Sequence, residues 1–213
     1  MFITFEGIDG CGKSTQVERF EARLKKTGIS LLITREPGGT KTGDAIRKIL
    51  LHLDGERVTP LTQLFLYEAD RAQHITEVIR PALDLGKWVV CDRFYDATTV
   101  YQGIVQGQGE DVAERLNYLS TSGLNPDITF LLDCPAEMAM ERIKIRDGTT
   151  KKRDMFDKKD IDFHRKIRHA YLSIAGKHKD RFRVIDASLS VDEIEEQIGG
   201  KILPYLIEND SMS

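Results

Sequence analysis

The sequence predicts an α/β protein in which a five-stranded parallel sheet is covered by helices on both faces. Short runs of β-branched and aromatic residues alternate with longer amphipathic runs, and a glycine-rich turn joins the first strand-like run to the helix-like run after it. Strands that alternate with helices form parallel sheets with right-handed crossovers. A chain of 213 residues with 40% hydrophobic content is long enough for one sizeable core. We therefore expect a single domain over residues 1–213.

Apolar spacing, prolines and glycines place the expected elements. Gly28 is expected to end the first helix, Pro60 suits the first turn of a long helix, and Pro81 is expected to end that helix. The expected strands cover residues 2–6, 30–34, 87–91, 127–132 and 181–185. The expected helices cover residues 14–26, 44–51, 60–79, 111–119, 135–145, 162–178 and 191–207, and a helix that gives way to a loop is expected over residues 97–109.

The turn after the first strand, residues 7–14, has the spacing of a phosphate-binding loop, with Gly7, Gly12, Lys13 and Ser14 at the expected positions. Glycines let successive backbone N–H groups face an anion, and the following helix adds its positive N-terminal end. Lys13 brings a charge to the phosphates, and Ser14 brings a hydroxyl to Mg²⁺. The loop predicts a nucleoside triphosphate site, and a glycine-rich turn without a ligand is the alternative.

Asp92 and Arg93 directly follow the apolar strand at residues 87–91. If this strand lies beside the first, Asp92 can approach the Mg²⁺ held by Ser14, and Arg93 can point at an acceptor anion. The alternative is an ion pair on the surface.

Three other segments are candidates for the acceptor side of the site. The turn at residues 35–40 follows a strand, and the long helix carries Tyr67 and Arg71 on a face interrupted by polar residues. The basic segment over about residues 142–157 is suited to a flap that closes over a transferring phosphate. In each case, solvated surface charges are the alternative.

Composition excludes several other classes of function. The net charge of −3 and the isoelectric point near 6.0 argue against a protein that binds nucleic acid polymers. Cys11, Cys91 and Cys134 lack the paired spacing of a zinc site, so we expect reduced thiols. The sequence shows no signal peptide and no run long enough to cross a bilayer, so we expect a cytoplasmic protein without a membrane partner.

The acceptor chemistry narrows the reaction. An alcohol acceptor needs a positioned base, whereas a phosphate monoester is already largely ionised near pH 7, because its second pKa is about 6. For a phosphate acceptor, the obstacle is repulsion between two anions, which Lys13, Mg²⁺, Arg93 and the basic flap would neutralise.

The motifs, in their order, resemble the thymidylate kinase family. They are Glu6-Gly7-Ile8-Asp9-Gly10-Cys11-Gly12-Lys13-Ser14-Thr15-Gln16, Thr34-Arg35-Glu36-Pro37-Gly38-Gly39-Thr40, Tyr67-Glu68-Ala69-Asp70-Arg71-Ala72-Gln73-His74, Asp92-Arg93-Phe94 with Tyr101-Gln102-Gly103, and Val184-Ile185-Asp186-Ala187-Ser188. The resemblance covers nearly the whole chain. It implies a three-layer P-loop nucleoside monophosphate kinase fold, phosphorylation of dTMP to dTDP by ATP with Mg²⁺, and a homodimer.

The resemblance also implies roles for residues. ATP would bind to Gly7, Ile8, Asp9, Gly10, Cys11, Gly12, Lys13, Ser14 and Thr15, and the metal to Ser14 and Asp92. The nucleotide acceptor would contact Asp9, Glu36, Pro37, Arg47, Tyr67, Arg71, Arg93, Thr98, Tyr101 and Gln102. Within this set, Arg93 would hold the phosphate, Tyr67 would stack on thymine, Arg71 would read the base, and Tyr101 would crowd the sugar C2′.

The catalytic set implied by the resemblance is Lys13, Arg93, Arg146, Arg153 and Asp9. Gly10 stands where some members have an arginine, so the chain is similar to the bacterial type, whose catalytic arginines lie in the lid. Ala97 and Gln106 depart from residues common in the family. Another nucleotide kinase and a regulatory nucleotide-binding protein are the two alternatives to a thymidylate kinase.

Overall fold

The computed structural model describes residues 1–52, 58–150 and 160–210, and within them a five-stranded sheet has the order β2-β3-β1-β4-β5. All the strand pairs are parallel. The strands are β1 (Phe2–Glu6), β2 (Leu31–Arg35), β3 (Trp88–Asp92), β4 (Ile128–Asp133) and β5 (Phe182–Asp186). The predicted fold class and strands are confirmed, with strand boundaries that differ by at most one residue.

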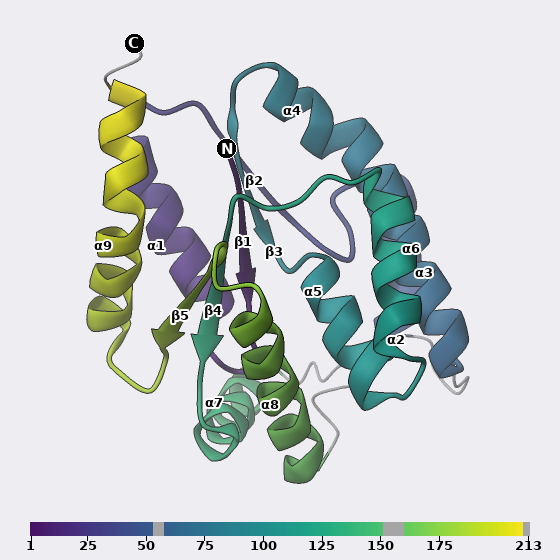
Figure 1. The fold of residues 1–213 in the computed structure, drawn as a ribbon. Coiled ribbons are helices and arrows are strands. Elements are labelled where there is room, and N and C mark those ends of the chain that lie inside the picture. The colour runs from purple at the N-terminus through teal and green to yellow at the C-terminus, as the bar shows by residue number, and fades with distance from the viewer. Residues whose placement is uncertain (53–57, 151–159, 211–213) are drawn as a thin grey trace.

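Helices cover both faces of the sheet, as Figure 1 shows, with α1 and α9 on one side and α3, α5 and α6 on the other. The helices are α1 (Lys13–Lys25), α2 (Lys41–His52), α3 (Pro60–His74), α4 (Arg80–Asp84), α5 (Tyr95–Thr98), α6 (Glu110–Thr121), α7 (Ala136–Thr150), α8 (Ile161–Lys177) and α9 (Val191–Asp210). Two π-helical segments, η1 (Ile75–Ile79) and η2 (Thr99–Val105), continue α3 and α5.

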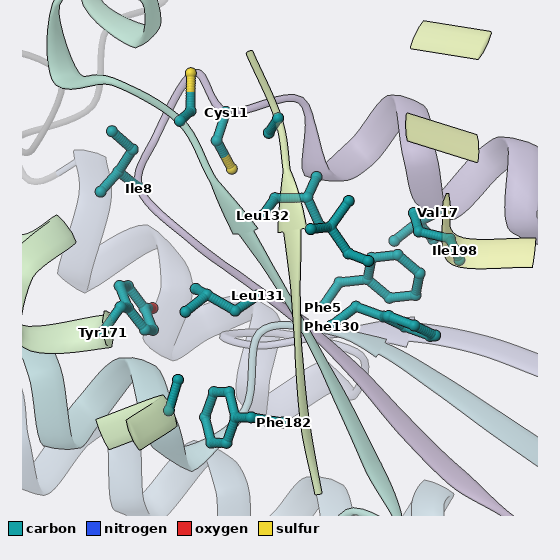
Figure 2. Close-up of a cluster of buried hydrophobic side chains, with 14 of the residues drawn as sticks. Phe5, Ile8, Cys11, Val17, Phe130, Leu131, Leu132, Tyr171, Phe182 and Ile198 are labelled. Carbon is teal, nitrogen blue, oxygen red and sulfur yellow. The ribbon is translucent and has the colours of Figure 1, made fainter. Parts of the chain in front are cut away.

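The core lies on both faces of the central strands. Phe5 and Phe130 stack with ring centroids 5.2 Å apart, and both are fully buried. Figure 2 shows Phe130 on the side of Val17 and its neighbour Leu131 on the side of Tyr171. This alternation is the period of a strand that is buried on both faces. It explains why the strands read as continuous apolar runs.

Several expected helix boundaries were wrong. The long helix does not end before Pro81 but continues through η1 into α4, where Pro81 occupies the first turn. A proline in the first turn of a helix removes no hydrogen bond that the helix needs. The π-helical turn before it shifts the hydrogen-bond register of the backbone. The helix expected to begin at residue 97 begins at Tyr95, and α7 extends past Ile145 to Thr150. The basic segment over residues 142–157 is therefore helical in its first part, and its remainder lies outside the described residues.

Candidate active site

The site lies where the central strands end. Strand β3 sits between β1 and β2, so that Asp92 is in register with Phe5 on one side and with Arg35 on the other. The loop between β1 and α1 emerges at the same edge, as the topology of an open parallel sheet requires.

A cavity of about 530 Å³ opens at this edge. Most of the sequence-predicted residues line it: Asp9, Gly10, Gly12, Lys13, Ser14, Thr15, Glu36, Pro37, Arg47, Tyr67, Arg71, Asp92, Arg93, Thr98, Tyr101, Gln102 and Arg146. Gly7, Ile8 and Cys11 do not line it, and the side chains of Ile8 and Cys11 belong to the hydrophobic core (Figure 2). Only the backbone of these residues can face a phosphate. Arg153 lies outside the described residues.

The loop is shaped by backbone that favours glycine. Gly12 caps α1 with φ 97° in the left-handed region, and Lys13 donates from Nζ to the carbonyl oxygens of Gly7 at 3.1 Å and Ile8 at 3.0 Å. A Cβ on Gly10 would lie 2.3 Å from the backbone oxygen of Ala139 in α7. Helix α7 therefore leaves no room for a side chain at this position.

Ser14 and Asp92 form a pair suited to a magnesium ion. The Ser14 hydroxyl donates to Oδ2 of Asp92 at 3.2 Å, and Oδ1 of Asp92 is buried without a hydrogen-bond partner among the described residues. In that part of the chain, no cluster of three or more His, Cys, Asp or Glu is arranged to hold a metal. Magnesium bound to a nucleotide takes few protein ligands and completes its shell with phosphate oxygens and water. One hydroxyl and one carboxylate fit that requirement.

Arg93 and Asp9 form an ion pair in the lining of the cavity. Nη2 of Arg93 donates to Oδ1 of Asp9, and Nη1 donates to the carbonyl of Gly7 at 2.9 Å and to the hydroxyl of Tyr171 at 3.2 Å. Burial favours the neutral form of Asp9, but the charges of Arg93 and Lys13 outweigh it and lower the pKa of Asp9 to about 2. Asp9 is therefore ionised at neutral pH.

Tyr101 lies against this pair. Its hydroxyl donates to Oδ2 of Asp9 at 3.2 Å, and the guanidinium carbon of Arg93 lies 5.4 Å from its ring centroid. Tyr101 is buried and lies within the π-helical segment η2. Tyr101 is thus held in one orientation from both its polar and its apolar side.

Four of the five N–H donors of Arg71 have hydrogen-bond partners among the described residues. Its Nε donates to Glu36 at 2.9 Å, its Nη1 to Glu68 at 3.0 Å and to Asn117 at 3.1 Å, and its Nη2 to Thr98 at 3.0 Å. Burial disfavours its charge, but Glu36 and Glu68 outweigh burial and raise its pKa. Because two carboxylates balance this charge, Arg71 is better suited to donate to a neutral carbonyl than to bind an anion.

The rest of the cavity lining combines cationic side chains with uncharged ones. Arg35, Arg47, Arg142 and Arg146 join Lys13 and Arg93 in the lining. The buried Gln102 also lines the cavity, and its Nε2 has no partner within the described ranges. A phosphate-bearing ligand with an uncharged ring would match this combination.

Two of the residues that hold Arg71, Glu68 and Asn117, were not among the site residues predicted from the sequence. Glu68 recurs on the apolar face of α3 with Leu64, and a carboxylate at such a position signals a buried ion pair. Asn117 carried no such signal, because it reaches Arg71 from α6, which is 46 positions away.

The comparisons with known proteins agree with this geometry. The family model described as thymidylate kinase matches residues 5–198. The chain belongs to the thymidylate kinase family.

Its relatives are similar along nearly their whole length. A thymidylate kinase of Geotalea daltonii is 47% identical over 211 residues, covering 98% of this chain and 99% of the relative. A thymidylate kinase of Geotalea uraniireducens is 44% identical over 209 residues, covering 97% and 98%. The crystal structure of a thymidylate kinase from Ehrlichia chaffeensis superposes with a TM-score of 0.78 at 31% identity, covering 95% of this chain and 98% of that one. The fold of this thymidylate kinase family member is thus the P-loop nucleoside monophosphate kinase fold.

Proposed function

We propose that the protein transfers the γ-phosphoryl group of ATP to the phosphate of dTMP, giving dTDP and ADP. Membership of the thymidylate kinase family supports this function. The observation that carries it is that the phosphate-binding loop and Arg93 line one cavity. A donor triphosphate on Lys13 and an acceptor phosphate on Arg93 would meet there, without a second binding site elsewhere.

The acceptor side needs charge neutralisation more than a base. A phosphate oxygen of dTMP attacks the γ-phosphorus while the bond to the β-phosphate oxygen breaks, and the acceptor is already ionised because its second pKa is about 6. Lys13 and Arg93 would hold the two anions in line. Arg142 and Arg146 line the same cavity, and Arg146 and Arg153 stay our candidates for lid arginines that reach the transferred phosphate.

Other side chains of the lining would recognise thymine and deoxyribose. Arg71, with its charge balanced, would donate to a base carbonyl, and Gln102 offers an Nε2 that has no partner among the described residues. Tyr67 lies in the lining, where its ring would stack on the base, with Thr98, Glu36, Pro37 and Arg47 around it. Tyr101 would occupy the space that a 2′-hydroxyl requires.

Magnesium belongs to the same proposal. Ser14 and Asp92 would hold it, and the buried Oδ1 of Asp92 supplies an acceptor without a protein donor among the described residues. Bound there, the ion would neutralise charge on the phosphates of ATP.

The homodimer and the cytoplasmic location are also proposed. Exposed apolar side chains lie on α3 (Leu61, Phe65) and α6 (Tyr118, Leu119), and a second copy could cover them. No helix in the described part of the chain is long and apolar enough to cross a membrane. The site takes mononucleotides, and we propose no nucleic acid polymer as a partner.

Product analysis tests the function. The protein is incubated with ATP, Mg²⁺ and dTMP, and the products are identified by mass spectrometry. We expect dTDP and ADP in equal amounts. ADP with inorganic phosphate and no dTDP would instead indicate a nucleotide hydrolase or a regulatory protein.

A further inference from the structure

Tyr171 lies in the middle of α8, where its ring packs into the core on the side of Leu131 (Figure 2). Its hydroxyl nevertheless reaches the active site. It donates to Oε2 of Glu6 at 2.7 Å and accepts from Nη1 of Arg93 at 3.2 Å. A buried hydroxyl thus joins a buried carboxylate to the arginine that faces the acceptor.

We propose that Tyr171 is a positioning residue for Arg93, which its hydroxyl holds in the orientation that receives the acceptor phosphate. The inference rests on the proposed function, because it assigns Arg93 to the phosphate of dTMP. Tyr171 itself would touch neither substrate. It would act by limiting the orientations that the guanidinium of Arg93 can take.

The ion pair between Arg93 and Asp9 makes such a restraint useful. Nη2 of Arg93 donates to Asp9, whose carboxylate competes with an incoming phosphate for the same guanidinium. Nη1 is fixed by the carbonyl of Gly7 at 2.9 Å and by the hydroxyl of Tyr171. With one nitrogen anchored, the planar guanidinium keeps its other donors aimed into the cavity, and less entropy is lost when a phosphate binds.

Glu6 gives the hydroxyl its direction. Since the Tyr171 proton goes to Oε2 of Glu6, the oxygen lone pair is left for Arg93. The other oxygen of Glu6 accepts the backbone N–H of Phe94 at 2.7 Å, directly after Arg93 in the chain. Glu6 therefore restrains Arg93 at both ends, through the backbone and through Tyr171.

The contributions of the ring and of the hydroxyl of Tyr171 can be measured separately. The ring packs edge-on against Tyr101, with centroids 6.3 Å apart, and phenylalanine would keep that packing. Tyr171→Phe removes only the hydroxyl. Tyr205→Phe is the matched control, because Tyr205 on α9 also accepts from an arginine, Arg183, at 3.2 Å, and neither residue lines the cavity.

The test compares the affinities of wild type and both variants for dTMP, for thymidine and for ATP, by calorimetry, and the KM values for dTMP and ATP. In Tyr171→Phe we expect the affinity for dTMP to fall about fivefold, as expected for the loss of one hydrogen bond that orients a charged group. Thymidine has no phosphate, so its affinity should stay within twofold, as should that of ATP. Tyr205→Phe should change none of them. Glu6→Gln should weaken dTMP binding in the same selective way.

Two results would overturn the inference. One is a Tyr171→Phe variant that binds dTMP as wild type does. The other is an equal loss of dTMP and thymidine binding, since this would show that the hydroxyl supports the pocket in general. A wild-type protein that phosphorylates no dTMP would instead refute the proposed function, and the inference with it.

Discussion

The hydroxyl of Ser14 lies 3.2 Å from Oδ2 of Asp92, although 78 positions separate the two residues in the chain. The parallel pairing of β1 with β3 brings them together, because it sets Phe5 opposite Asp92 and leaves the loop of Ser14 just beyond. The end of the cavity that we propose for ATP and magnesium is therefore built from two neighbouring strand ends.

Removal of the Asp92 charge should weaken magnesium use. In Asp92→Asn we expect the Mg²⁺ concentration for half-maximal activity to rise about tenfold or more, because one of two protein groups at the ion loses its charge. Asp192→Asn, on exposed α9, is the control and should leave the titration unchanged. A titration of activity with Mg²⁺ measures both, and an unchanged midpoint in Asp92→Asn would exclude Asp92 from the metal site.

Arg93 should bind the phosphate of the acceptor, and Lys13 should bind the phosphates of the donor. Arg93→Ala should lower the affinity for dTMP about 100-fold while ATP binding is largely retained, because charge-assisted hydrogen bonds to the phosphate are lost. Lys13→Ala should show the opposite pattern. Calorimetry with each nucleotide alone measures the two affinities. An equal loss of ATP affinity in both variants would contradict this division.

The Tyr101 ring should set the preference for deoxyribonucleotides over ribonucleotides. Tyr101→Ala opens the space beside Asp9, so the preference for dTMP over the matching ribonucleotide should fall by tenfold or more. Tyr101→Phe keeps the ring and should keep the preference, although it removes the 3.2 Å hydrogen bond to Asp9. Ratios of kcat/KM for the two substrates give the result. If Tyr101→Ala discriminates as wild type does, the ring does not face C2′.

Asp70 should make stability depend on pH. It is fully buried, with Oδ1 accepting the N–H of Gly38 at 2.9 Å, and burial followed by the charge of Glu36 raises its pKa to about 7 from 3.8. Between these values the folded state binds a proton that the unfolded state has lost. The free energy of unfolding should therefore fall as pH rises from about 4 to 7, and then level off, with a total on the order of 4 kcal/mol.

Urea unfolding of wild type and Asp70→Asn at pH 5 and pH 8 measures this effect. Asp70→Asn cannot ionise, so its stability should fall less between the two pH values than that of wild type. Part of the dependence should remain, because burial and then Asp96 raise the pKa of Glu6 to about 7 as well. Asp111→Asn, on the surface of α6, should keep the full dependence. Equal slopes in Asp70→Asn and wild type would show that Asp70 is ionised in the folded protein.

The sequence was sufficient to predict the strands and the loop that we propose for ATP. Buried parallel strands are continuous apolar runs, and the loop from Gly7 to Ser14 carries its chemistry in consecutive residues. The position of Asp92 followed from strand topology, because parallel strand ends share an edge. These are local patterns joined by one general rule.

Contacts between distant elements could not be predicted in this way. Asn117 reaches Arg71 from α6, and Tyr171 reaches Arg93 from α8, and in sequence both read as ordinary helix residues. The π-helical segment before Pro81 was missed for a related reason. Whether a proline ends a helix depends on the register of the preceding turn, which tertiary packing decides.

A coupled assay of ADP release with dTMP, dUMP, UMP, CMP and AMP as acceptors tests the central claim most directly. The geometry around Arg71, Gln102 and Tyr101 predicts the highest kcat/KM with dTMP, a lower value with dUMP, and little activity with the ribonucleotides. Equal rates with dTMP and the ribonucleotides would contradict it.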